Sequence, residues 1–312
     1  MSEPTALHEL LLAWFARAAR DLPWRHTRDP YRILVAEVML QQTQVERVIP
    51  KYHAFLAAFP TLAALAAAPT AEVIRLWAGL GYNRRAVNLQ RAARAILEEH
   101  GGHFPRELAA LRRLPGVGPY TAGAVACFAF EQDVAFLDTN IRRVLRRALH
   151  GPDEAVPAPD DRALLASGAA LLPPGRGWAW NQALMELGAL VCTATTPACP
   201  RCPLRGHCRA YAARLAADEA LVLAMGAGGP ARPRRIAERK EPPFVGSRRW
   251  YRGRLVDALR AVPAHSALAL VELGPRVKPD YVAADEPWLR DLVADLARDG
   301  LVRLEGDAVR LP

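Results

Sequence analysis

The chain has 312 residues, which is enough for about two domains that each bury a core. No apolar run reaches the length that crosses a membrane, and the N-terminus lacks the basic and then apolar pattern of a signal peptide, so we expect no membrane partner and no export. The formal net charge of +9 favours a polyanionic partner, although a basic surface also serves solubility alone.

Helical periodicity dominates the first two-thirds of the chain, where no convincing strand pattern occurs. The first apolar stripe comprises Leu7, Leu10, Leu11, Trp14, Phe15 and Ala18. Pro and Gly residues separate the further helices, which we expect at about 31–49, 61–67, 70–77, 85–99, 105–114, 120–130, 139–149, 160–171 and 178–191.

A glycine-containing turn at residues 114–120 lies between two of these helices. Gly116 and Gly118 allow the backbone to turn tightly and to approach a ligand, and the N–H groups that begin the next helix suit a phosphate. The pattern is that of a helix–hairpin–helix. Alone, such a hairpin indicates only binding to the DNA backbone without sequence preference, and a Gly-rich turn between helices is most often merely a turn.

Four of the five cysteines lie in one loop with the spacing Cys192-x6-Cys199-x2-Cys202-x5-Cys208. A [4Fe–4S] cluster needs four converging thiolates, one for each iron, and the prolines of this loop keep it from forming a helix. Structural zinc is the alternative, but zinc usually takes two short Cys pairs, and only Cys199 and Cys202 form one here. The spacing favours the cluster, and reduced thiols indicate a cytoplasmic protein. The fifth cysteine, Cys127, lies in an apolar run and is expected in the core.

The C-terminal third begins with residues 226–246, which are rich in Gly, Pro and Arg and typical of a flexible basic linker. From Ser247 we expect a small winged-helix-like domain. Its predicted elements are helices at about 248–261, 265–274 and 285–299 and a strand pair at 301–304 and 308–311. Four arginines of its first helix either bind phosphate or form an ordinary polar helix face, and both alternatives stay open: Arg248, Arg249, Arg252 and Arg254.

Several separated motifs together resemble one family. The hairpin, the Leu-Asp-Thr-Asn-Ile-Arg-Arg segment at 137–143 and the cysteine loop are similar to the iron–sulfur helix–hairpin–helix DNA glycosylases, the superfamily of endonuclease III and MutY. The segments 36–45, 77–82 and 181–192 resemble the MutY branch, which acts on adenine. The resemblance covers about residues 7–210.

This resemblance implies an all-α fold. A six-helix barrel with the hairpin is expected at 25–133, and an iron–sulfur cluster domain is expected from 1–24 together with 134–215. The linker at 216–246 and the winged-helix-like α+β domain at 247–312 follow. Longer members carry a nudix-like domain that recognises 8-oxoguanine, and this tail is too short for that fold.

Cleavage of an N-glycosidic bond calls for one acid and one carboxylate, and Glu37 and Asp138 are the candidates. Glu37 shares its predicted helix face with apolar residues, which should raise its pKa, although a solvated or salt-bridged glutamate is the alternative. The resemblance implies that Glu37 protonates adenine and then activates water, while Asp138 stabilises the cationic sugar. Asp138 also precedes a helix and is expected to be its N-cap.

The resemblance assigns further residues to the site. Tyr120 and Asn140 match other catalytic positions, where they orient Glu37 and the water or Asp138. The remaining matches are an adenine pocket at Arg25, Leu40 and Gln182 and duplex-wedging residues at Gln42, Thr43 and Tyr82. From the residues themselves we expect phosphate binding at Gly116 and Gly118 of the hairpin and at Arg201 and Arg205 of the cysteine loop, where a solvated charged loop is the alternative for the arginines.

Endonuclease III-like enzymes place a Schiff-base lysine where this chain has Tyr120, and none of the three lysines, Lys51, Lys240 and Lys278, is near the hairpin. We therefore expect a monofunctional, monomeric glycosylase in the cytoplasm, associated with the nucleoid, whose partner is double-stranded DNA with adenine mispaired with guanine or 8-oxoguanine. The alternatives are a thymine or uracil mismatch glycosylase on the same scaffold, and a non-catalytic iron–sulfur DNA-binding or redox-sensor protein.

Overall fold

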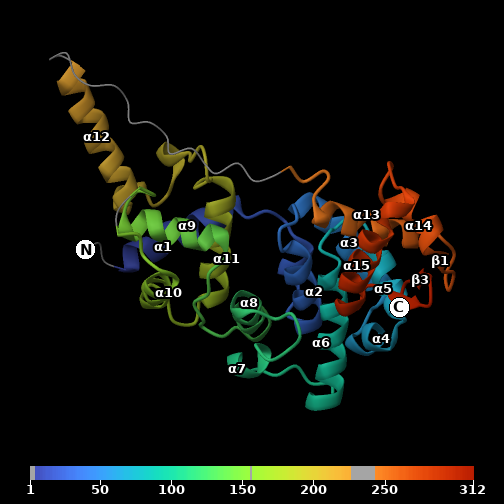
Figure 1. Cartoon of the computed structure of the whole chain (residues 1–312). Coiled ribbons are helices and arrows are strands. Elements are labelled where there is room, and N and C mark those ends of the chain that lie inside the picture. The colour runs from blue at the N-terminus through green and yellow to red at the C-terminus, as the bar shows by residue number, and fades with distance from the viewer. Residues whose placement is uncertain (1–3, 155–156, 226–242) are drawn as a thin grey trace. The chain divides into compact units, whose positions relative to one another are not determined.

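The computed structural model describes residues 4–154, 157–225 and 243–312 (Figure 1). The chain divides into two compact units, and each contains segments distant in sequence. Unit 1 comprises Met1–Pro30 and Gly118–Ile236, and unit 2 comprises Tyr31–Val117 and Ala237–Pro312. Most of the predicted linker, residues 226–242, lies outside the described part of the chain. No helix in the described part is long and apolar enough to span a membrane.

Unit 1 is built from helices that pack around the pair α9 and α11. Its helices are α1 (Pro4–Ala18), α8 (Pro119–Phe130), α9 (Thr139–Leu145), α10 (Asp161–Ala170), α11 (Gly177–Leu190) and α12 (Arg209–Met225). α8 is buried from Thr121 to Phe128, because its small residues admit neighbours closely: a Cβ at Gly123 would lie 2.7 Å from the Cβ of Phe136. Cys127 is fully buried in this helix, so its predicted core position is confirmed.

Two features of unit 1 depart from the predicted helices. The helix expected at 139–149 ends at Leu145 and continues as a π-helical turn, Arg146–His150. α12 has no counterpart in the prediction and runs past residue 215, where the cluster domain was expected to end.

Unit 2 contains the first helices of the expected barrel. They are α2 (Pro30–Leu40), α3 (Val45–Ala58), α4 (Leu62–Ala67), α5 (Thr70–Leu76), α6 (Arg84–His100) and α7 (Leu108–Leu111). The single helix predicted at 31–49 is wrong, because the chain breaks between α2 and α3, where Gln42 has a φ of +55°. α2 is buried without interruption from Ile33 to Met39, and Tyr31 at its start is buried as well.

The C-terminal part of unit 2 has the predicted winged-helix-like order. It consists of α13 (Arg248–Arg260), β1 (Leu268–Ala269), α14 (Leu270–Val277), α15 (Glu286–Arg298), β2 (Arg303–Glu305) and β3 (Ala308–Arg310). The three strands form an antiparallel sheet in the order β1-β3-β2, with Val309 opposite both Leu268 and Leu304. Strand β1 was missed, since the segment from residue 265 was expected to be helical.

This C-terminal domain shares a hydrophobic core with the helices of the barrel. Ile74 of α5 and Val87 of α6 belong to the same buried cluster as Leu255, Leu273 and Leu296. Figure 1 shows the C-terminus beside α4 and α5, and the Ala71 N–H donates to the Pro312 carbonyl at 3.1 Å. The domain is therefore an integral part of unit 2.

Two arginines fasten the C-terminal domain to α5. Arg75 of α5 donates to the Val262 carbonyl at 3.0 Å and to the Arg260 carbonyl at 2.5 Å. In return, Arg260 donates to the Ile74 carbonyl at 2.7 Å and to Asn83 Oδ1 at 2.8 Å. The reciprocal bonds satisfy carbonyls at the ends of α5 and α13, where helices leave such groups unpaired.

Candidate functional site

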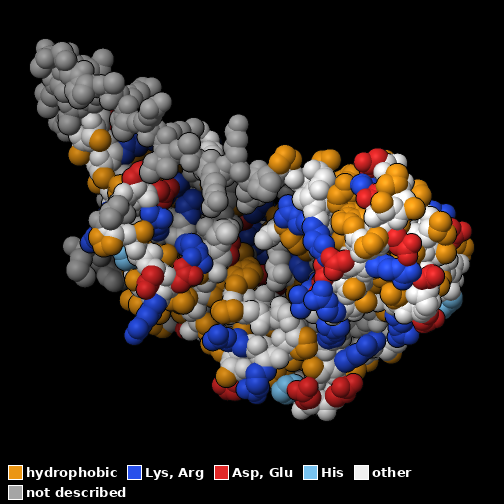
Figure 2. All heavy atoms as spheres, in the orientation of Figure 1, with side chains coloured by type: hydrophobic (Ala, Val, Ile, Leu, Met, Phe, Trp, Pro, Cys, Tyr) orange, Lys and Arg blue, Asp and Glu red, His pale blue; other side chains and the backbone are white. Residues whose placement is uncertain are grey.

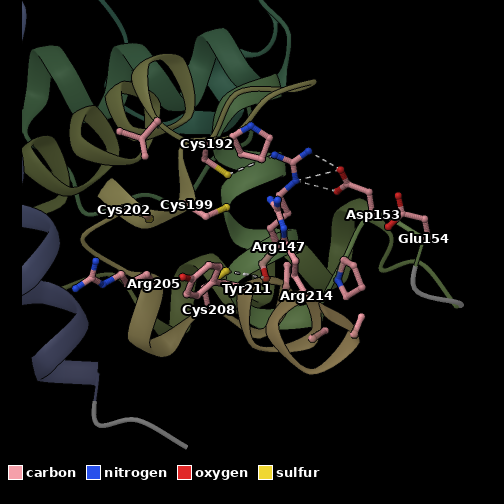
Figure 3. Close-up of a pocket in the computed structure, with 16 residues that line it drawn as sticks. Arg147, Asp153, Glu154, Cys192, Cys199, Cys202, Arg205, Cys208, Tyr211 and Arg214 are labelled. Carbon is pink, nitrogen blue, oxygen red and sulfur yellow. Dashed lines mark hydrogen bonds and ion pairs between the residues drawn. The ribbon is translucent and has the colours of Figure 1, made fainter. Parts of the chain in front are cut away.

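The four cysteines of the loop after α11 line one cavity of about 400 Å³ (Figure 3). All four are free thiols. In Figure 3 the labelled cysteines surround the same space, with Arg147 at its edge. Cys192, Cys199, Cys202 and Cys208, the predicted cluster ligands, are all among the residues that line this cavity.

Within this cavity the described side chains show no group of three or more Cys, His, Asp or Glu arranged to hold a metal ion. Burial raises the pKa of the Cys202 thiol to about 11, and the neighbouring cysteines act in the same direction. Burial likewise raises the pKa of Cys208. A cationic centre in the cavity would favour the thiolate forms of Cys202 and Cys208.

Arg147 provides positive charge at the wall of this cavity. Its guanidinium donates to Cys192 Sγ at 3.6 Å and to the Thr193 carbonyl at 2.7 Å, and it pairs with Asp153. Arg147 is itself buried, and it lies in the π-helical turn that follows α9. The sequence analysis missed it, since a second arginine in an Arg-rich helix carries no distinguishing signal.

The loop also presents two of the predicted phosphate-binding residues. Arg201 and Arg205 are both exposed, and Arg205 donates to the Pro200 carbonyl at 2.6 Å. Their charges therefore face solvent beside the cysteine cavity.

In the hairpin, only one of the two glycines is required by its own conformation. Gly116 has a φ of +77°, and a Cβ there would lie 2.7 Å from Asn88 Cβ. Gly118 has an ordinary φ of −86° and is the N-cap of α8, and a Cβ there would meet nothing within 4 Å. The open space at Gly118, next to the first N–H groups of α8, is where a phosphate could approach.

Asp138 is the N-cap of α9, as predicted. One of its carboxylate oxygens accepts from the Ile141 N–H at 2.6 Å, and the other accepts from Asn140 Nδ2 at 2.9 Å. Burial raises its pKa, while the hydrogen bonds from Ile141 and Asn140 and the charge of Arg143 oppose that rise. The carboxyl is thus held in one orientation in a partly buried setting.

Asn140 and Arg143 extend this arrangement toward the cysteine loop. Arg143 donates to Asn140 Oδ1 at 2.8 Å and to the backbone carbonyls of Gly188 and Cys192. A Cβ at Gly188 would lie 2.5 Å from Asn140 Cβ, so glycine allows α11 to approach α9 closely. Tyr120, at the start of α8, packs edge-on against Phe136 with ring centroids 5.7 Å apart.

Glu37 lies in the buried helix α2 of unit 2 and is 2% exposed. The expected apolar setting is present, since Ile33, Leu34 and Val38 are buried on the same helix. Asp138, Asn140 and Tyr120 belong to unit 1, so the two candidate carboxyl groups come from different units.

The predicted adenine-pocket residues are divided in the same way. In unit 1, Arg25 Nε donates to Gln182 Oε1 at 2.9 Å, and Arg25 also pairs with the buried Glu186 at 2.8 Å. Gln182 is buried, with 5% of its surface exposed. Leu40 is half-buried at the end of α2 in unit 2.

The predicted wedge residues lie on two loops of unit 2 that meet at one arginine. Arg85 Nη1 donates to the Val38, Met39 and Gln41 carbonyls at 2.6–3.1 Å. Arg85 Nη2 donates to Thr43 Oγ1 at 3.2 Å and to the Leu80 carbonyl at 2.9 Å. One guanidinium therefore joins the 41–43 loop to the 79–82 loop, and it brings Thr43 and Tyr82 into one region.

Arg85 was not predicted as a site residue. Burial lowers its pKa to about 10, which still leaves it charged at neutral pH. The sequence around Arg85 gives no signal for this role, because the Val38, Met39 and Gln41 carbonyls that it joins to its own loop lie far away in the chain.

Unit 2 also carries a basic surface. Figure 2 shows Lys and Arg side chains in a band over the region of unit 2 where Figure 1 places α6, α13 and α15. A cavity of about 720 Å³ lies there between the 79–85 loop and α13. Its basic lining residues are Arg84, Arg85, Arg249, Arg252 and Arg260.

Similarity to known proteins agrees with these features. Residues 35–162 match the family described as HhH-GPD superfamily base excision DNA repair protein. The adenine DNA glycosylase of Mycolicibacterium smegmatis is 42% identical over 300 residues, which cover 95% of this chain and 92% of that protein. The adenine DNA glycosylase of Homo sapiens is 45% identical over 224 residues, which cover 67% of this chain and 40% of that protein.

Solved structures show the same fold. A thermostable thymine-DNA glycosylase superposes with a TM-score of 0.63 at 33% identity, covering 67% of this chain and 97% of that one. Endonuclease III trapped covalently on DNA superposes with a TM-score of 0.57 at 25% identity, and the match covers 69% of this chain and 100% of that chain. The all-α helix–hairpin–helix fold with a small C-terminal domain is thereby confirmed. Because the mycobacterial likeness extends over nearly the full length of both chains, this chain belongs to the adenine DNA glycosylase family of the HhH-GPD superfamily.

Proposed function

We propose that the protein is a monofunctional adenine DNA N-glycosylase of base-excision repair, which hydrolyses the N-glycosidic bond of adenine mispaired with guanine or 8-oxoguanine. The observation that carries the proposal is the burial of the Glu37 carboxyl in α2, where solvent is excluded from the group that must deliver a proton. The family membership supports the choice of adenine as the base.

In the proposed mechanism Glu37 is the general acid. It donates its proton to N7 of adenine, and the bond between N9 and the sugar C1′ breaks with its electron pair passing to the departing base. Glu37, now a carboxylate, accepts a proton from the water that attacks C1′. The products are free adenine and an abasic site.

Asp138 stabilises the positive charge that develops on the sugar. Its fixed orientation at the N-cap of α9 supports this role, because a preorganised carboxylate needs no rearrangement during bond cleavage. We assign Asn140 to holding Asp138 and Tyr120 to orienting Glu37 and the water. Tyr120 in place of a Schiff-base lysine supports hydrolysis without strand cleavage.

The remaining residues bind the DNA. Arg25, Leu40 and Gln182 form the pocket for the extruded adenine, and Gln182 reads the edge of the base. Gln42, Thr43 and Tyr82 enter the duplex and occupy the gap that adenine leaves. Backbone N–H groups at Gly116 and Gly118 and the side chains of Arg201 and Arg205 bind phosphates.

We assign a [4Fe–4S] cluster to the cysteine cavity, with Cys192, Cys199, Cys202 and Cys208 each binding one iron. The shared cavity of about 400 Å³, which all four cysteines line, supports this fit. When bound, the cluster supplies four iron–sulfur bonds that fix the loop carrying Arg201 and Arg205. We expect a monomer that works on nucleoid DNA in the cytoplasm.

The test is single-turnover base release from duplexes that pair adenine with 8-oxoguanine, guanine or cytosine, and thymine with guanine. Adenine release opposite guanine and 8-oxoguanine is the expected result. The 33% identity to a thymine-DNA glycosylase makes thymine release the second candidate activity, and faster thymine release would replace adenine as the substrate. No release of any base, with duplex binding retained, would support a non-catalytic DNA-binding protein.

Strand cleavage and the cluster have their own assays. Borohydride should trap no covalent protein–DNA adduct, and the product strand should break only after alkali treatment. Protein purified without oxygen should contain four irons and four acid-labile sulfides. Stoichiometric zinc in protein made with abundant iron would contradict the cluster.

A further inference from the structure

Tyr82 is held in a backbone conformation that bulky residues rarely adopt. Its φ is +45°, and the preceding Gly79 and Gly81 also have positive φ values. For a non-glycine residue this costs free energy, so it persists only where the surroundings impose it. Arg85 and Trp77 impose it here, since Arg85 donates to the Leu80 and Gly81 carbonyls and Trp77 Nε1 donates to Gly81 at 3.1 Å.

The Tyr82 side chain is oriented by the C-terminal domain. Arg249 Nη1 of α13 donates to the Tyr82 hydroxyl at 2.8 Å, and the guanidinium carbon lies 5.6 Å from the centroid of the Tyr82 ring. The same guanidinium lies 4.8 Å from the ring centroid of Phe244, just before α13. Arg249 therefore contacts the hydroxyl and the ring of Tyr82 and is itself packed against a second ring.

The other arginines of α13 have internal partners. Arg248 pairs with Asp291 and Asp295, and Arg252 pairs with Asp299. Arg254 donates to the Val277 carbonyl at 2.7 Å. Neither Arg249 nor Arg254 has a carboxylate partner in the part of the chain that the structure describes, and of the two it is Arg249 that donates to the Tyr82 hydroxyl.

The Arg249–Tyr82 pair lies at an open surface. Tyr82 is 45% exposed, and both residues line the cavity of about 720 Å³ between the 79–85 loop and α13. A contact that only stabilised the packing of the C-terminal domain on the other helices of unit 2 would lie in their shared core. The Arg249–Tyr82 contact instead borders a space that a nucleic acid strand can enter. The bond from Arg260 to Asn83 fixes α13 next to the same loop.

We propose that Arg249 is a positioning residue for Tyr82, through which the C-terminal domain acts on base excision. The inference rests on the proposed function, in which Tyr82 enters the duplex beside the mispair. Arg249 fixes the rotamer of the Tyr82 ring before DNA binds, so the ring enters the duplex without first being ordered. The C-terminal domain thus contributes to the rate of the reaction as well as to binding.

The experiment is a double-mutant cycle in the full-length holoprotein with Arg249→Gln, Tyr82→Phe and both changes together. Single-turnover adenine release from an adenine–guanine duplex is measured at saturating protein, and duplex affinity is measured separately. We expect each single variant to slow release about three- to tenfold. The double variant should be no slower than the slower single variant, because both changes remove the same interaction.

Arg248→Gln is the matched control, since it removes the same charge from the neighbouring position of α13. It should weaken duplex binding to the same extent as Arg249→Gln and leave the rate at saturation unchanged. Arg249→Lys should restore part of the rate, because an ammonium keeps the charge and loses the planar stacking on the rings.

Two outcomes would overturn the inference alone: adenine release by Arg249→Gln as fast as by Arg248→Gln, or rate losses that multiply in the double variant. A wild-type protein that releases no adenine would overturn the proposed function and this inference together. Thermal unfolding of wild type, Arg249→Gln, Tyr82→Phe and the double variant distinguishes the failure of this inference from the failure of the proposed function. A coupling between Arg249 and Tyr82 in melting temperature tests their contact without any measurement of activity.

Discussion

Single residues in the site combine structural and chemical roles, and Asp138 is the clearest case. It caps α9, as its position before a helix predicts, and the same carboxylate is the proposed stabiliser of the sugar cation. Asp160 is a natural comparison, because it caps α10 in the same way, accepting from the Ala163 N–H at 2.8 Å. The two caps allow helix capping and catalysis to be measured apart.

We predict that Glu37→Gln and Asp138→Asn each slow single-turnover adenine release at least about a hundredfold, the usual size of an acid–base contribution, and leave duplex binding nearly intact. Asp160→Asn should change the rate by less than about twofold, since only a cap is altered. Near-wild-type release by Glu37→Gln or Asp138→Asn would remove that residue from the mechanism.

The hairpin glycines give a second prediction at the residue scale. Gly116→Ala should lower the free energy of unfolding by about 2 kcal/mol, because alanine is strained at positive φ and its Cβ meets Asn88. Gly118→Ala should leave the unfolding free energy unchanged and weaken duplex binding, because the added methyl group fills the space left for a phosphate. Urea unfolding and fluorescence anisotropy separate the two effects; equal affinities for wild type and Gly118→Ala would move the phosphate site elsewhere.

At the scale of elements, ion pairs and carbonyl clamps connect segments that local sequence does not pair. Glu186 of α11 is fully buried and binds both Arg20 and Arg25, so it fixes the 20–26 segment against α11. Burial alone would raise its pKa, but hydrogen bonds from Arg20 and Arg25 outweigh burial and lower the pKa to about 2. Its contribution to stability is therefore present above the unfolded pKa of about 4.5 and is lost as the pH falls toward 2.

We predict that Glu186→Gln lowers the free energy of unfolding by about 3 kcal/mol at pH 7, since it leaves buried arginine charge without its partner. The difference from wild type should shrink as the pH falls from 4.5 toward 2, because the Glu186 carboxylate becomes protonated in the unfolded state while it stays charged in the folded state. Glu131→Gln is the control, because Glu131 pairs with Arg28 at the surface and should contribute less than about 1 kcal/mol. A difference that stays constant down to pH 3 would contradict the assigned ion pair.

For the molecule as a whole, the C-terminal domain is built into unit 2 through a shared core. Removing it by truncation after Met225 would expose the side chains of Ile74 and Val87 and leave the Ile74 carbonyl without Arg260. We predict a loss of about 3 kcal/mol in unfolding free energy from the two exposed side chains. Duplex binding should become weaker and less sensitive to salt, because arginines are lost.

Arg75→Gln in the full-length protein is the comparison for this truncation. It removes the bonds from α5 to the carbonyls after α13 and keeps every apolar contact, so its effect on unfolding should be the smaller one. An unfolding curve of the truncated protein that coincides with that of the full chain would show that the domain is independent of the barrel.

The sequence alone determined the features that neighbouring residues encode. Spacing predicted that the four cysteines would share one site, hydrophobic periodicity predicted most helices and the winged-helix-like order, and the position of Asp138 predicted its capping role. Only the tertiary structure decided the break at Gln42, the clamp formed by Arg85, the contact from Arg249 to Tyr82 and the shared core at Ile74. The break occurs in a run without Gly or Pro, because carbonyls from two distant loops converge on one guanidinium and outweigh the local preference for helix. Such contacts join residues far apart in the chain, and they leave no periodic or compositional trace in either segment.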